Sequence, residues 1–151
     1  MANSKSQREA EVWIREQWLP DEFGQPFLKK KLQLRSGGKF EFDGVSQDER
    51  IAVSISTNCG IRSSGKKATP KLHKIRSDAL FLLLLDNVER RVIVFSDRYM
   101  FDLCEAEIKN GRFPIEVEIK LASLPAELES ALVQARCIAA QEVSPTGNFR
   151  G

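Results

Sequence analysis

Three polar side chains on two neighbouring predicted strands form the first arrangement that could perform chemistry. Asp43 lies near the end of a strand predicted over 39–45, and Ser54 and Ser56 lie on a strand predicted over 51–57. Because successive side chains of a strand point to opposite faces, the two serines share one face, on which we also expect Asp43. Two structural interpretations remain open. Asp43 could be a turn residue before Gly44, and the serines could be small residues beneath a helix.

A second arrangement is a segment of glycine, hydroxyl and basic residues between a predicted strand and a predicted helix. Residues 58–76 contain no acid, and the candidate DNA contacts among them are Arg62, Ser64, Lys66, Lys67, Lys71 and Arg76. Such groups contact phosphates and carry little sequence information. No aromatic residue is interleaved there, which favours duplex or branched DNA over single strands, whose bases stack on aromatic rings. A solvated loop is the other interpretation.

The charges of the whole chain are segregated. The formal net charge of the 151 residues is only +2, from 23 Lys and Arg against 21 Asp and Glu. Residues 23–76, however, hold twelve basic and four acidic residues, a net of +8, which leaves −6 for the remainder. A local positive field attracts a polyanion even when the total charge is small. This distribution favours a nucleic-acid partner over a neutral ligand.

The hydrophobic pattern predicts the elements that must position these residues. Helices are predicted over 5–18, ending before Pro20, and over 69–86, 97–110 and 124–142. Strands are predicted over 30–35, 39–45, 51–57, 91–96 and 115–121, the first two joined as a hairpin by Ser36-Gly37-Gly38. The apolar run 79–85 fits either a central helix or a buried strand. We expect one domain over 1–143 and a loose tail over 144–151.

Length and composition exclude several classes of protein. The longest apolar run, 79–85, has seven residues, whereas a membrane span needs about twenty. The N-terminus is polar and has no signal-peptide core. The three cysteines are odd in number, lie far apart and show no metal-binding spacing, so we expect reduced thiols in a cytoplasmic protein with no membrane partner. His73 is the only histidine and has no paired nucleophile, which argues against a serine or cysteine hydrolase.

The predicted order of elements resembles the PD-(D/E)xK nuclease superfamily, the restriction-endonuclease-like fold. The likeness covers about residues 5–96 and rests on the order helix, three strands, helix, strand, with Asp43 near the end of a hairpin strand. It implies an α/β protein with an αβββαβ core, a central mixed sheet flanked by helices, and an extra C-terminal strand and helix. It also implies Mg²⁺-dependent cleavage of DNA, in which acids bind the metal and a lysine assists the attacking water, and a homodimer.

This sequence departs from the family motif at two positions. Ser54 and Ser56 stand where the family has its second acid and its lysine, and a neutral hydroxyl is a poor Mg²⁺ ligand. The motif has therefore decayed, or its groups come from neighbouring helices. The resemblance then implies as catalytic candidates Asp43, Ser54, Ser56, Lys74 and Asp78.

Metal ligands would come from the same strand and helices. The candidates are Asp43, Glu9 and Asp78, with Glu16 as another acid of the first helix. Each has a structural alternative: Asp78 can form an ordinary helical pair with Lys74, and Glu9 and Glu16 can be solvated.

Three functions remain open at this point. The first is a DNA-binding protein with a nuclease-like fold, acting as a metal-dependent endonuclease through a degenerate or migrated active site. The second is a non-catalytic DNA-binding or protein-interaction subunit of a repair or defence system. The third, a small nucleotide-binding protein, rests on the G-x-x-x-x-G-K pattern at Gly60–Lys66. Against it, Lys67 replaces the Ser or Thr of that pattern, and the helix is predicted to begin only at Pro70.

Overall fold

The structure is a computed structural model that describes residues 4–58 and 69–143. Its elements are α1 (Ser4–Trp13), the π-helix η1 (Ile14–Trp18), α2 (Leu19–Phe23), β1 (Phe27–Gln33), β2 (Lys39–Ser46), β3 (Ile51–Ser56), α3 (Thr69–Leu83), β4 (Arg90–Phe95), α4 (Arg98–Lys109), β5 (Val117–Leu121) and α5 (Ala126–Val143). The predicted order of helices and strands is confirmed. The predicted tail at 144–151 lies outside the described residues.

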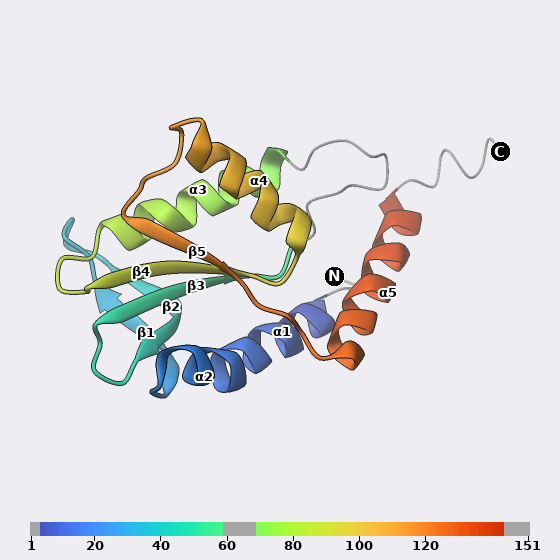
Figure 1. The fold of residues 1–151 in the computed structure, drawn as a ribbon, viewed down its shortest axis with the longest axis horizontal. Coiled ribbons are helices and arrows are strands. Elements are labelled where there is room, and N and C mark those ends of the chain that lie inside the picture. The colour runs from blue at the N-terminus through green and yellow to red at the C-terminus, as the bar shows by residue number, and fades with distance from the viewer. Residues whose placement is uncertain (1–3, 59–68, 144–151) are drawn as a thin grey trace.

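The five strands form one mixed sheet in the order β1-β2-β3-β4-β5. The first three strands are antiparallel neighbours, whereas β3, β4 and β5 run parallel. Parallel strands need a crossover connection, and α3 and α4 supply the two crossovers. Both helices cover one face of the sheet, while α1 and α2 cover the other and α5 packs against α1 (Figure 1). The protein is thus of the predicted α/β class.

The side chains of β3 divide between two hydrophobic cores. Ile51, Val53 and Ile55 pack on the α1 side with Ile14 and Leu19, whereas Ala52 belongs to the core beneath α3 and α4. This is the alternation predicted from the sequence. All six residues of β3 are buried because the strand lies at the centre of the sheet with helices on both faces. β3 therefore provides a rigid base for the side chains at its two ends.

The N-terminal helix continues through Pro20, so the prediction that it ends before this residue is wrong. The chain widens into η1, where the Leu19 N–H reaches back to the Ile14 carbonyl. Pro20 then falls in the first turn of α2, where a missing N–H costs nothing. The helix ends instead at Gly24, whose φ of +77° is the left-handed conformation that glycine tolerates.

The ambiguous apolar run and the C-terminal elements are also defined. Residues 79–83 belong to α3, so the helix interpretation is confirmed over these positions. α4 is capped by Asp97, which accepts a hydrogen bond from the Met100 N–H at 2.9 Å.

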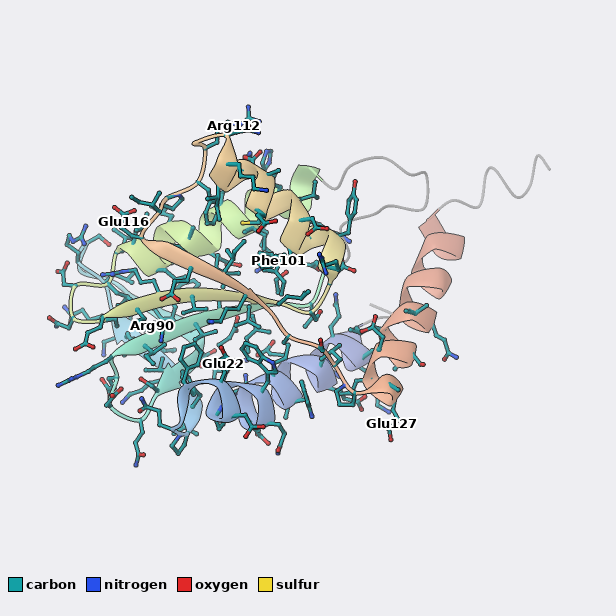
Figure 2. All side chains as sticks on the ribbon, viewed as in Figure 1. Glu22, Arg90, Phe101, Arg112, Glu116 and Glu127 are labelled. Carbon is teal, nitrogen blue, oxygen red and sulfur yellow. The ribbon has the colours of Figure 1, made fainter. Side chains whose placement is uncertain are left out.

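β5 forms one edge of the sheet. Ion pairs connect it to its neighbours on the side of α2, from Arg90 to Glu118 and from Lys120 to Glu22 (Figure 2). No helix of residues 4–58 and 69–143 is long and apolar enough to span a bilayer.

Candidate functional site

Strands β2 and β3 separate at Asp43. Only two residue pairs join them, Gly44–Val53 and Val45–Ala52. On the other side of β2 the register against β1 shifts, because Leu28 faces Val45 but Lys30 faces Phe42. One extra residue of β2 is therefore accommodated at Asp43–Gly44, which makes this point a β-bulge. Bulges bend a strand and re-aim its side chains, often beside a functional site.

The first half of β2 leaves β3 because it is held by the end of α3. The rings of Phe40 and Phe81 stack with centroids 4.0 Å apart. The hairpin turn adds a hydrogen bond of 2.7 Å from the Arg35 N–H to the Leu84 carbonyl. The sheet thus opens between β2 and β3 on the side beyond Asp43.

Gly44 allows the bulge to pack closely against the N-terminal helices. A Cβ at this position would lie 2.9 Å from Leu19 Cδ1 and 3.5 Å from Phe27 Cδ2. Leu19 is fully buried and has little room to withdraw. Asp43 and Gly44 lie within β2, so the alternative interpretation of Asp43 as a turn residue is wrong. Glycine is needed for this close approach of the chain to α2.

The Asp43 carboxylate completes the hydrogen bonding of β3 where β2 has left it. The Ile55 N–H donates to Asp43 Oδ2 at 2.8 Å. A strand carbonyl would ordinarily accept such an N–H, and a buried N–H without an acceptor is costly. The side chain is consequently fixed against β3, at the point where the two strands diverge.

A cavity of about 280 Å³ opens at this point between α1 and α3. Its lining consists of Gln7, Arg8 and Glu11 from α1, Asp43 from β2, Ile55, Thr57 and Asn58 from β3 and its end, and Lys74 from α3. We call it the Asp43 pocket. The Gln7 amide donates weakly to the Thr57 carbonyl at 3.5 Å and to Asn58 Oδ1 at 3.4 Å, which joins α1 to the end of β3. The pocket is polar and bounded by secondary structure on both sides.

Burial raises the pKa of Asp43 to about 6. The Ile55 N–H opposes this effect, while the negative charges of Glu11 and Asp78 add to it. Burial also raises the pKa of Asp78, against the influence of Lys74, whose Nζ lies 3.4 Å from its carboxylate. Carboxyl groups with perturbed pKa values in a cleft are candidates for a functional site.

Glu11 belongs to this pocket and was not among the predicted site residues. Its carboxylate lies 2.9 Å from the Arg15 guanidinium and 3.5 Å from Lys29 Nζ. Arg15 also donates to the Asp43 carbonyl at 3.1 Å, so it links the helix to the bulge. The i, i+4 spacing of Glu11 and Arg15 is visible in the sequence, but it is common on helix surfaces and indicates no site by itself.

Ser54 and Ser56 do not line the Asp43 pocket. Both are buried, and alternation along β3 turns them towards α3, whereas the pocket takes Ile55 and Thr57. We therefore find no support for the expected common face with Asp43. Within the described part of the chain, the buried Ser56 hydroxyl has no hydrogen-bond partner.

The acids expected to bind a metal are not gathered in one place. Glu9 and Glu16 line a different groove, beside Leu128 of α5. Residues 4–58 and 69–143 contain no group of three or more His, Cys, Asp or Glu placed to hold a metal ion. The two acids whose charges act on Asp43 are held in ion pairs, Glu11 with Arg15 and Lys29 and Asp78 with Lys74. This donor set does not fit the Mg²⁺ site that the resemblance implies.

The candidate DNA contacts divide into two groups. Arg62, Ser64, Lys66 and Lys67 lie outside the described residues. Lys71 lies in the first turn of α3, and Arg76 of the same helix pairs with Glu107 at 2.5 Å. Because α3 begins at Thr69, Lys66 precedes its first turn, as the sequence predicts. This agrees with the argument against a nucleotide-binding loop.

Ion pairs reduce the positive charge of residues 23–76. Acids outside this window neutralise several of its basic residues: the pairs are Lys29–Glu11, Arg35–Asp86, Arg50–Glu89, Lys74–Asp78 and Arg76–Glu107. The net charge of +8 that residues 23–76 carry is therefore partly cancelled in the folded protein by acids from other parts of the chain. The basic residues of the 59–68 segment accordingly matter more to the DNA interpretation than the total does.

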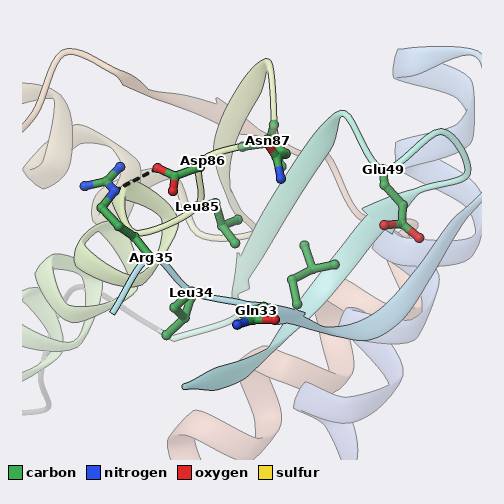
Figure 3. A pocket seen from close by; sticks show the side chains of 9 residues that line it. Gln33, Leu34, Arg35, Glu49, Leu85, Asp86 and Asn87 are labelled. Carbon is green, nitrogen blue, oxygen red and sulfur yellow. Dashed lines mark hydrogen bonds and ion pairs between the residues drawn. The ribbon is translucent and has the colours of Figure 1, made fainter. Parts of the chain in front are cut away.

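A second cavity, of about 440 Å³, lies between the end of β1, the β2–β3 turn and the connection from α3 to β4 (Figure 3). Arg35 and Asp86 form an ion pair of 2.7 Å at its rim, and Arg35 also donates to the Leu83 carbonyl. These contacts attach the hairpin to the end of α3. The charges of this cavity thus serve packing, which leaves the Asp43 pocket as the better candidate.

The fold and the site define an α/β protein with a polar, carboxylate-bearing pocket at a split in its sheet. No protein-family model, no curated protein and no solved structure matches the chain. The resemblance to the restriction-endonuclease-like fold therefore stays a prediction.

Proposed function

We propose that the protein binds DNA on the face that carries the Asp43 pocket, on a core of the restriction-endonuclease-like kind. The observation that carries this proposal is the position of the pocket relative to the basic segment. Thr57 and Asn58 precede residues 59–68, Lys74 follows them, and all three line the pocket. The described chain therefore leaves the pocket directly before the basic segment, and α3, which follows the segment, returns to the pocket at Lys74. The Arg and Lys side chains of the segment are the type that contacts phosphate.

Two further features support binding of a phosphate backbone. α3 begins at Thr69, directly after the basic segment, and carries Lys71 in its first turn. The N-terminus of a helix favours negative charge, so the segment and the helix would act on the same phosphates. The order α1, three antiparallel strands, α3 and a parallel β4 supports the core assignment.

Cleavage of DNA is the second candidate function, favoured by the raised pKa of Asp43 beside Glu11 and Asp78. Metal-assisted cleavage needs carboxylates that converge on the ion. In the described part of the chain these neighbours are held in ion pairs and no ligand cluster forms. Binding without cleavage is thus the function that the site supports best, as in a non-catalytic subunit of a repair or defence system.

Binding is tested by fluorescence anisotropy with a labelled duplex and a labelled four-way junction at several salt concentrations. We expect the Lys66→Glu/Lys67→Glu variant to lose about tenfold or more in affinity and about two units of the salt slope. The matched control is Lys31→Glu/Lys39→Glu, which makes the same charge change at exposed positions of β1 and β2. Equal binding by wild type and the first variant would remove the DNA interpretation.

Cleavage is tested on supercoiled and branched DNA with Mg²⁺ or Mn²⁺, comparing wild type with Asp43→Ala. Binding without cleavage in either metal supports the proposal. Cleavage by wild type that Asp43→Ala abolishes would establish the second candidate instead.

A further inference from the structure

A groove of about 520 Å³ runs along the exposed side of α1 and η1, beside α5. Its centre is apolar, formed by Val12 and Trp13 of α1 and by Leu128 of α5. Val12 is 40 % exposed and is one of the large hydrophobic residues that remain open to solvent. α5 lies beside α1 in Figure 1 and forms one wall of this groove. The groove is distinct from the Asp43 pocket, although Arg8 lines both.

The charged residues of the groove are ordered by sign along the helix. Lys5 and Arg8 lie towards its start, Glu9 lies near the middle, and Glu16 lies towards its end. None of these four forms an ion pair within residues 4–58 and 69–143. Glu11 and Arg15, on the other side of the same helix, are both paired. Lys5 and Glu16 thus lie without ion-pair partners at opposite ends of an apolar strip, and such an arrangement of charges is self-complementary.

We propose that this groove is the interface between two copies of the chain, packed antiparallel about a two-fold axis. In a two-fold interface a contact from one residue to another occurs twice. Placing Lys5 opposite the partner's Glu16 sets the axis level with positions 10 and 11 of the helix. Val12 of each copy then lies close to the axis and packs into the apolar centre of the other groove. Both ends of the interface gain an opposite-charge pair.

The proposed dimer is weak and sensitive to salt. The contact rests mainly on one pair of helices, which is small beside the roughly 1,200–2,000 Å² that stable interfaces bury. Its ion pairs are exposed and are screened at high ionic strength. We therefore expect dissociation in about the micromolar range or above at low salt. This proposal does not depend on DNA binding.

Sedimentation equilibrium of the whole chain over a range of concentrations tests the interface. Lys5→Glu and Glu16→Lys each turn two attractive contacts into two repulsive ones, and each should weaken self-association about tenfold. An equimolar mixture of the two variants should associate again, because every contact in the mixed dimer then joins opposite charges. Asp21→Lys, a charge reversal on α2 outside the groove, should leave association unchanged.

Val12→Asp tests the apolar centre separately. We expect this variant to be monomeric, with circular dichroism and an unfolding midpoint close to those of wild type, because Val12 is already exposed. A wild-type chain that stays monomeric at millimolar concentration and low salt would overturn the proposal. So would a dimer that Val12→Asp leaves intact, or a mixture of the charge variants that fails to associate.

Discussion

The two ends of the β2–β3 pair differ in how well their polar side chains are hydrogen-bonded. At the turn between the strands, Ser46 Oγ donates to Asp48 at 2.7 Å and accepts from the Ile51 N–H at 3.0 Å. At the other end Asp43 is a half-buried carboxyl group, and the buried Ser56 hydroxyl has no partner in the described part of the chain. The first end is arranged for stability. The second retains polar groups at a cost, which is characteristic of functional sites.

Two aspartates five residues apart make the same contrast. The hydrogen bond from Ser46 and the Arg50 N–H hold the pKa of Asp48 below its ordinary value. Burial raises the pKa of Asp43 to about 6. The charge of Asp48 therefore stabilises the folded chain, whereas the charge of Asp43 destabilises it. Of the two aspartates, Asp48 therefore has a structural role, and Asp43 is the candidate for a functional one.

The largest expected effect is a gain of stability in Asp43→Asn at neutral pH. The folded state binds the Asp43 proton more tightly than the unfolded state, so wild-type stability falls as pH rises from about 4 to about 6. The gap between 3.8 and about 6 corresponds to up to about 3 kcal/mol. Asparagine has no charge to bury and still offers an oxygen to the Ile55 N–H. Urea unfolding at pH 4 and pH 7 measures the difference.

The difference between wild type and Asp43→Asn should be small by pH 4 and vanish in stronger acid, where the aspartate is protonated in both the folded and the unfolded state. A variant that is less stable than wild type at pH 7 would show that the Asp43 charge is stabilising after all. That result would remove the contrast between the two aspartates.

The next effect compares the same substitution at the two ends. Ser46→Ala leaves the buried Ile51 N–H without its acceptor and should lower the free energy of unfolding by about 1–3 kcal/mol. Ser56→Ala removes a hydroxyl that makes no hydrogen bond to the described residues and should be neutral or slightly stabilising. Both serines are almost fully buried, so each is the matched control for the other. Equal losses would mean that Ser56 is hydrogen-bonded as well as Ser46.

The smallest effect is expected for Asp48→Asn, with a pH dependence opposite to that of Asp43→Asn. Because the folded pKa of Asp48 is lowered, its charge contributes stability above about pH 4, and this contribution is lost as pH falls through the folded pKa. The variant should be slightly less stable than wild type at pH 7 and equal to it in strong acid. Thermal unfolding across this pH range measures the difference. A constant difference would point to lost hydrogen bonds rather than lost charge.

The sequence predicts most of the fold because local patterns determine most of it. Alternation in 51–56 identifies both faces of β3, and Asp97 and Gly111 mark the ends of α4. Pro20 was misinterpreted because proline ends a regular α-helix but is allowed in the first turn of a new segment. No local sequence pattern predicts the π-helix η1, because it depends on how the N-terminal helices pack against the sheet.

The site was harder to predict because its partners are distant in the sequence. The sequence identifies Asp43 as a site residue, but the pocket around it includes Glu11 rather than Glu9. The two glutamates flank the same apolar stripe of α1, and the direction of the helix across the sheet decides which one faces β2. The charge of residues 23–76 was overestimated for a similar reason: Arg76, for example, meets Glu107 only after folding.

The π-helix η1 has a consequence for the geometry of the site. The buried residues of the N-terminal helices are Ala10, Ile14 and Leu19, with spacings of four and then five. In a regular α-helix a step of five residues overshoots a full turn by about 140°. The wider turn of η1 absorbs this overshoot, so Leu19 remains in phase with Ala10 and Ile14 and reaches Gly44. The additional residue in this turn thus allows Leu19 to pack against Gly44, and this contact helps to hold the bulge and Asp43 in place.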